Sequence, residues 1–222
     1  MQPVSQPVSQ PAGRRGLPQS ARGFTLLEAM IALAILAVVL SVGMPRMNAW
    51  IYAGKVASAG QFYAEGFALA RGQALTHNSA SRMVLSENAV NGQFDWQVDI
   101  CFPRPDDPCN DSSSNWSTTG AAAERDPEGA AGFKSVLRRA DALPAARELA
   151  QAVGPDDARS VYFTPLGWVN PAIAPYVERI NLTPAASMAK DAPATAIVLT
   201  LAGIATRCKP GVAANDPHRC PP

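Results

Sequence analysis

The sequence has few of the residues and motifs that most enzymes use for catalysis. Its 222 residues include two histidines, His77 at the end of a predicted helix and His218 in the C-terminal tail. The serine-rich stretch 111–115 is not part of a G-x-S-x-G nucleophile elbow, and no glycine-rich phosphate loop follows a predicted strand. We therefore expect no catalytic residue, and the chain is not predicted to be an enzyme.

Metal-binding spacings and a surplus of positive charge are also missing. Asp106, Asp107 and Asp111 crowd one acidic loop but lack the twelve-residue ligand spacing of a calcium-binding loop. The formal net charge is +1, from 19 basic and 18 acidic residues, and this balance does not indicate a nucleic-acid-binding protein. We expect no metal and no cofactor.

Charge is almost absent from one long apolar run, 24–44, in which Glu28 is the only charged residue. As a helix, this run would extend about 32 Å, enough to cross a bilayer. It is longer than the apolar region of a secretory signal peptide, and no A-x-A-like cleavage site follows it. An ordinary signal anchor is an open alternative, but it leaves Glu28 unexplained. A carboxylate in a membrane costs about 2.5–3.5 kcal/mol and usually marks function.

The start of this run resembles a known signal. Residues 23–28 read G-F-T-L-L-E, and together with the apolar residues that follow they resemble the class III signal of type IV pilins and type II secretion pseudopilins. The resemblance implies that a prepilin peptidase cleaves between Gly23 and Phe24 and N-methylates Phe24. It also implies that Glu28 pairs with the N-terminal amine of a neighbouring subunit in the filament, and that Pro45 is the family's helix-kinking proline.

The same resemblance implies a division of the chain into four segments. These are a cytoplasmic prepilin leader at 1–23, a transmembrane helix at 24–44, its amphipathic continuation at 45–78, and a periplasmic β-rich globular domain with a cysteine-bounded tail at 79–222. The leader contains Arg14, Arg15 and Arg22 and no acid, so it should stay cytoplasmic under the positive-inside rule. Its removal would leave 16 basic against 18 acidic residues.

The implied location is the bacterial inner membrane, which the chain crosses once with its N-terminus in the cytoplasm, and afterwards a pilus or pseudopilus. The implied partners are other pilins and minor pilins in a filament, the prepilin peptidase, the inner membrane and the inner-membrane assembly platform.

The region after Pro45 predicts one helix followed by short strands. Five apolar residues recur at helical steps on a helix that should end near Thr76: Val56, Tyr63, Phe67, Ala70 and Ala74. Strand-like runs follow at 82–86, 94–102, 133–139, 158–164, 176–182 and 195–201. Asn91-Gly92 predicts a hairpin, 103–132 a loop, and 144–153 a short helix. One long helix packed on an antiparallel β-sheet is an α+β architecture, and it is pilin-like.

Four cysteines lie outside the apolar run: Cys101, Cys109, Cys208 and Cys220. In a periplasmic domain an even number of cysteines indicates disulfides, and four allow three connectivities. The local pairs 101–109 and 208–220 enclose small loops and are favoured. Cross-pairing stays open, and so does a metal site, although C-x-x-C spacing is absent.

Three segments of the globular part resemble the GspH/FimT group of minor pilins and pseudopilins: 69–78, 160–167 and 197–208. This resemblance implies a structural subunit that enters the filament at or near its tip, in either a pilus or a secretion pseudopilus. Some members of that group bind DNA for uptake through arginines that follow the glycine of the final hairpin.

DNA binding for uptake (competence) is therefore the alternative function. Here Gly203 is followed by three uncharged residues and by one arginine, Arg207, so the usual Arg-x-Arg pair is missing. Lys209 and Arg219 complete the set of candidate DNA contacts. Two or three cations would give weak, salt-sensitive binding, so DNA is possible but is not the favoured partner.

Overall fold

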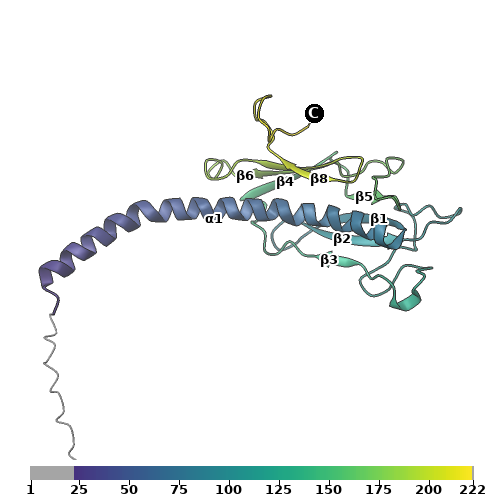
Figure 1. Cartoon of the computed structure of the whole chain (residues 1–222), viewed down its shortest axis with the longest axis horizontal. Helices are drawn as coiled ribbons and strands as arrows, with labels where there is room; N and C mark the ends of the chain where they lie inside the picture. Colours follow the sequence, from purple (N-terminus) through teal and green to yellow (C-terminus); the bar gives the residue numbers. More distant parts are fainter. Residues whose placement is uncertain (1–22, 222) are drawn as a thin grey trace, which may run out of the picture. The chain divides into compact units, whose positions relative to one another are not determined.

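The computed structural model describes residues 23–221. The chain divides into two compact units, Met1–Met44 and Pro45–Pro222, and helix α1 (Leu26–His77) contributes to both. Eight strands and one 3₁₀ turn follow α1 within the described residues (Figure 1): β1 (Ala80–Glu87), β2 (Phe94–Cys101), η1 (Gly129–Ala131), β3 (Val136–Arg138), β4 (Leu149–Gly154), β5 (Ser160–Phe163), β6 (Arg179–Pro184), β7 (Thr195–Leu199) and β8 (Ala205–Cys208).

The part of α1 in the second unit packs one face into the core. The five residues of the predicted stripe are all buried, which confirms the helical spacing: Val56, Tyr63, Phe67, Ala70 and Ala74. The helix ends at His77 because Asn78 adopts a left-handed backbone conformation, with φ 45°. The Ser79 N–H then donates to the Ala74 carbonyl at 3.2 Å, as in a Schellman cap.

The strands form two four-stranded sheets in which the paired strands are antiparallel. The first sheet has the order β3-β2-β1-β5, and the second has the order β4-β6-β7-β8. The hairpin predicted at Asn91-Gly92 joins β1 to β2, and these strands pair from Ala80 opposite Cys101 to Glu87 opposite Phe94. The α+β, pilin-like arrangement is the predicted one, but its division into two sheets was not foreseen.

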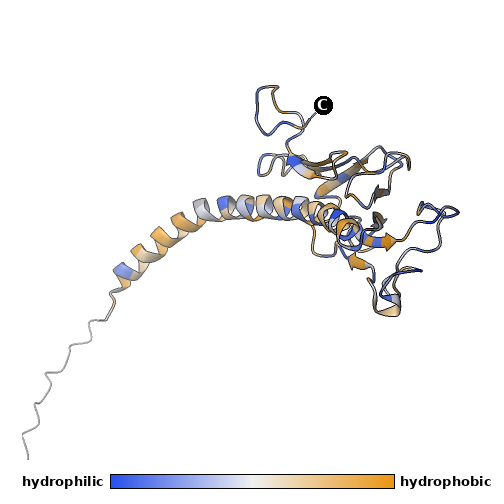
Figure 2. Cartoon of the chain, turned by 45° about the vertical axis from the view of Figure 1, so that its right-hand side comes forward, coloured by the Kyte–Doolittle hydropathy of each residue, from blue (hydrophilic) through white to orange (hydrophobic). Residues whose placement is uncertain are grey.

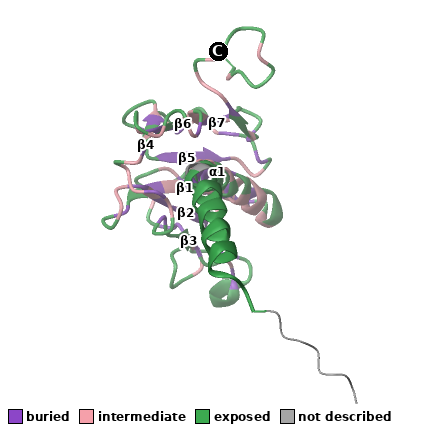
Figure 3. Ribbon diagram, turned by 90° about the vertical axis from the view of Figure 1, so that its left-hand side faces the viewer, coloured by how far each residue is buried: buried purple, intermediate pink, exposed green. Residues whose placement is uncertain are grey.

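In the second unit α1 packs against both sheets (Figure 1), and one apolar cluster contains side chains from all three. Towards the first sheet, the indole Nε1 of Trp96 on β2 donates to the Phe62 carbonyl at 2.9 Å. Towards the second sheet, the Tyr52 hydroxyl donates to the Glu148 carbonyl, just before β4, at 2.7 Å. Figure 3 shows buried residues on strands of both sheets.

A polar network in this core also joins the helix to both sheets. The Tyr63 hydroxyl donates to Gln151 Oε1 on β4 at 2.7 Å and accepts the backbone N–H of Phe94 on β2 at 3.2 Å. The buried Gln93 amide donates to the Leu149 carbonyl at 2.8 Å. Burial raises the pKa of Tyr63 above its ordinary value, so the phenol stays protonated and keeps its role as a donor.

One predicted element is wrong. The helix expected at 144–153 is replaced by strand β4, which pairs with β6 at the edge of the second sheet. Leu149 and Val153 are buried and Gln151 joins the polar network, whereas the alanines between them are exposed. This two-residue period belongs to a strand with one face on the core, and its pairing overrides the local helix propensity. The loop predicted at 103–132 holds η1 and no named strand.

Candidate methylation signal and basic tail

Residues 23–28 lie at the start of α1, where the sequence predicts processing and assembly. Gly23 and Phe24 precede the helix and are exposed, Phe24 by 85%. Thr25 caps the helix, because its Oγ1 accepts the backbone N–H of Glu28 at 3.2 Å. Glu28 is exposed in the first turn, where a carboxylate also offsets the helix dipole. The Gly23–Phe24 bond is thus at an exposed end, and Glu28 has a local role besides any pairing.

The described residues of the apolar run 24–44, which contains Glu28, are exposed within the first unit. Figure 2 shows this part of α1 as mainly hydrophobic. Its exposed large side chains are Leu26, Leu27, Met30, Ile31, Leu33, Ile35, Leu36, Val38, Val39, Leu40 and Met44. By length and composition, α1 is the one helix among residues 23–221 that could cross a membrane. So much exposed apolar surface on one helix is consistent with anchoring in the inner membrane.

Two parts of the predicted signal cannot be placed. The leader up to residue 22, with Arg14, Arg15 and Arg22, lies outside the described residues. At Pro45 the backbone is helical as part of α1, and the side chain lies outside the described part. The cytoplasmic leader and the proline kink stay predictions.

The four cysteines form two disulfides, Cys101–Cys109 and Cys208–Cys220. These are the pairs that loop size favours. Cys101 and Cys109 lie in a second buried cluster with Trp116, so the first bridge holds part of the long loop against β2. The second bridge joins the end of β8 to the tail. No cysteine among the described residues is free, so none offers a thiolate to a metal.

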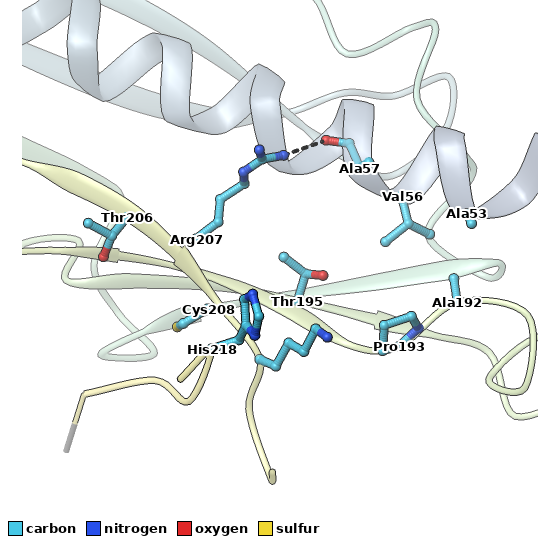
Figure 4. Close-up of a pocket in the computed structure, with 11 residues that line it drawn as sticks. Ala53, Val56, Ala57, Ala192, Pro193, Thr195, Thr206, Arg207, Cys208 and His218 are labelled. Carbon is cyan, nitrogen blue, oxygen red and sulfur yellow. Dashed lines mark hydrogen bonds between the residues drawn. The ribbon is translucent and has the colours of Figure 1, made fainter. Parts of the chain in front are cut away.

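The three candidate DNA contacts are only partly brought together. Lys209 and Arg219 are neighbours, because their backbones form an isolated bridge. Arg207 extends from β8 towards α1, and its Nη1 lies 3.5 Å from the Ala57 carbonyl to which it donates (Figure 4). Arg207, Lys209 and His218 line a groove of about 540 Å³, whose other walls are mainly small or apolar residues of α1, β7, β8 and the segment just before β7. The arginine nearest the final glycine is therefore engaged by the helix.

Both histidines and the acidic loop residue Asp111 have structural contacts. His77 packs on Phe133, with ring centroids 5.4 Å apart, and His218 Nδ1 lies 3.3 Å from Asp216. The backbone N–H of His218 donates to Asp216 and holds the pKa of that carboxyl below its ordinary value. The carboxylate of Asp111 accepts the Tyr162 hydroxyl. Among residues 23–221, no group of three or more His, Cys, Asp or Glu side chains is placed to hold a metal ion.

The sequence placed turns within 160–167 and 197–208 but did not indicate that the turns at 164–168 and 200–204 expose large apolar side chains. Both read Thr-x-x-Gly followed by a large apolar residue. A search for short repeated turn motifs would have detected them.

Comparison with protein-family models supports the interpretation of the N-terminus. Residues 18–44 match the prokaryotic N-terminal methylation motif, the signal of type IV pilins. The match includes Gly23, Phe24, Glu28 and the apolar run, and it supports a type IV pilin-like protein with a structural rather than a catalytic role. It also favours N-terminal methylation, processing by a prepilin peptidase and pilin subunits as partners. Comparison with curated proteins and with solved structures gives no match.

Proposed function

We propose that the protein is a minor pilin or pseudopilin, a non-enzymatic subunit that enters a type IV pilus or a type II secretion pseudopilus at or near its tip. The observation that carries this proposal is the methylation motif at 18–44, whose apolar residues form an exposed helix in a chain with a pilin-like fold. The resemblance of 160–167 and 197–208 to the GspH/FimT group supports the minor-subunit role. These segments form β5 with its turn and most of the β7–β8 hairpin.

In this proposal, a prepilin peptidase removes residues 1–23 and methylates the new N-terminus at Phe24. The arginine-containing leader stays in the cytoplasm. The second unit, with its two disulfides, enters the oxidising periplasm. The apolar helix retains the subunit in the inner membrane until the assembly platform adds it to the filament.

Glu28 selects the docked position of the subunit. A carboxylate among packed apolar helices is destabilising unless it is paired. The amine of Phe24 on a neighbouring subunit supplies the opposite charge. The Thr25 hydroxyl engages the backbone N–H of Glu28 and not its carboxylate, so the helix cap and the proposed ion pair are compatible.

Mass spectrometry of the membrane-bound protein tests the processing step. The wild-type chain should begin at N-methylated Phe24, and Gly23→Val should retain the leader. Gly43→Val is the matched control, because a Cβ at Gly43, as at Gly23, meets nothing within 4 Å, and Gly43 is remote from the cleavage site. A leader retained on wild-type filaments would contradict the proposal.

Glu28→Gln and Glu28→Leu test assembly. Both should insert into the membrane like the wild type but be depleted from sheared filaments, because neither can form the ion pair. Glutamine keeps a polar group in the first turn of the helix. If Glu28→Gln is depleted from filaments, the cause is therefore the lost charge and not a lost helix cap. Ser41→Ala, a polar-to-apolar change in the same segment, should assemble normally. Equal incorporation of Glu28→Gln and wild type would remove the ion pair from the mechanism.

A further inference from the structure

Two turns with the same sequence pattern occur in the globular unit. Residues 164–168 read T-P-L-G-W after β5, and residues 200–204 read T-L-A-G-I between β7 and β8. In each, the threonine N–H donates to the carbonyl of the fifth residue, at 2.8 and 3.0 Å, and the glycine N–H donates to the threonine carbonyl, at 2.8 Å in both. Gly167 and Gly203 have φ values of 73° and 76°, the left-handed conformation that such three-residue hairpin loops require.

The two turns contact each other and the end of α1. The Val169 N–H, one residue after the first turn, donates to the Leu201 carbonyl in the second turn at 2.9 Å. A Cβ on Gly167 would lie 3.0 Å from Leu75 Cγ on α1, and a Cβ on Gly203 would collide with the Gly167 carbonyl. Both glycines are therefore needed for close approach, and the turns are held in place before any partner binds.

Large apolar side chains cover this end of the unit. We call the group the end patch; its members are between 46% and 69% exposed, and they are Leu75, Leu166, Trp168, Leu201 and Ile204. Between residues 60 and 221, the described chain exposes seven large apolar side chains, and five of them belong to the end patch. Turns normally carry small polar residues, and gathered exposed apolar side chains mark interaction sites.

The charges around the end patch restrict its partner. Neither 160–177 nor 192–206 contains a charged residue. The cation next to the patch is Arg71 of α1, whose Nε donates to the Ala202 carbonyl at 3.3 Å. One guanidinium is too few for a phosphate backbone or an anionic bilayer, because both affinities grow with the number of cations engaged. In a pair of copies docked patch to patch, the turns of one copy supply no carboxylate for Arg71 of the other, whereas a different protein can supply one.

We propose that the end patch docks on an apolar surface of a different protein, one with a pocket for the Trp168 indole and a carboxylate facing Arg71. Tryptophan and arginine are the residue types that most often dominate binding at protein interfaces. The fixed turns reduce the ordering that binding requires. This inference goes beyond the filament role proposed above and does not depend on it.

Site-specific photo-crosslinking in the full-length protein, in cells that produce it, identifies the partner. A benzophenone amino acid at position 168 should form an adduct with one other protein, identified by mass spectrometry. Position 90 is the matched control, because Val90 is 74% exposed in the β1–β2 turn, outside the end patch. No adduct at 168, equal labelling at 168 and 90, or adducts only with nucleic acid, lipid or a second copy of this chain would overturn the proposal.

The protein identified in this way is then purified and titrated against the full-length protein in detergent. Trp168→Ala and Arg71→Gln should each weaken binding by about tenfold or more, whereas Val90→Ser should leave the affinity unchanged. Because Trp168 is 60% exposed, the Trp168→Ala variant should unfold at the same temperature as the wild type. Weaker binding by this variant would then not come from unfolding. An unchanged affinity for Trp168→Ala would contradict the proposal, and so would a partner that binds Arg71→Gln as tightly as wild type.

Discussion

Gly66 and Gly72 lie on the same helix, yet their replacement by alanine should change stability in opposite directions. Alanine is favoured over glycine in a helix by up to about 1 kcal/mol. A Cβ at Gly72 would meet nothing within 4 Å, so Gly72→Ala should stabilise the fold by about 0.5–1 kcal/mol. A Cβ at Gly66 would lie 2.7 Å from Met83 Cε and 3.0 Å from Trp96 Cδ2.

The neighbours of Gly66 have little room to move. Met83 and Trp96 are buried, and the indole of Trp96 is anchored on the Phe62 carbonyl. Overpacking of a filled core costs about 1–3 kcal/mol. This cost exceeds the gain in helix propensity, so Gly66→Ala should lower the free energy of unfolding by about 0.5–2 kcal/mol.

Urea unfolding of the Pro45–Pro222 unit, followed by tryptophan fluorescence, measures both changes. In thermal unfolding, each kcal/mol corresponds to about 2–4 °C in Tm for a unit of this size. Adding Met83→Ala should reduce the cost of Gly66→Ala, because the two side chains compete for one volume. If Gly66→Ala stabilises the unit as much as Gly72→Ala does, the reasoning from packing is wrong.

Three further predictions concern the disulfide, acid sensitivity and DNA. Replacing Cys101 and Cys109 by serine should lower the free energy of unfolding by about 2–3 kcal/mol through lost loop closure, and an unchanged urea midpoint would contradict this. The hydrogen bond from Arg139 lowers the pKa of Asp141 below its ordinary 3.8. The ionised Asp141 therefore stabilises the fold fully above its unfolded pKa, and this stabilisation is lost as pH falls through its lower folded pKa. Asp141→Asn should therefore make Tm fall less steeply as the pH is lowered below about 4. Duplex DNA should not bind saturably at about 0.15 M salt, because three phosphate contacts give a salt slope near −2.7; low-micromolar binding lost on Arg207→Ala would favour the DNA-uptake function.

The helical half of the fold could be predicted because its determinants are local. The buried stripe of α1 repeats at helical steps, and the helix stop at Asn78 needs only a residue that tolerates a left-handed conformation. The methylation motif is likewise a short continuous stretch of sequence, and a family model detects it in this chain.

The sheets and the polar core were harder to predict from the sequence, because the residues that pair to form them are far apart in the chain. The Tyr63 hydroxyl meets Gln151 across 88 positions of sequence, and no local pattern marks that glutamine as a core residue. Pairing between distant segments also explains why the helix predicted at 144–153 is wrong. Its composition favours a helix, and only pairing with β6, about thirty residues further along, makes it a strand.

The end patch shows why a functional surface can be hidden in a sequence that otherwise predicts its fold well. Leu166, Trp168, Leu201 and Ile204 would ordinarily be assigned to the core, since large apolar residues beside strands are usually buried. Their turns place these side chains at the surface. After Gly203, where some members of the GspH/FimT group carry DNA-binding arginines, this chain has Ile204 at 52% exposure. Exposed apolar side chains on well-formed turns do not help the fold, and such local conflicts are expected at functional sites. We therefore expect this hairpin to contact an apolar protein partner, as proposed above, rather than a phosphate backbone.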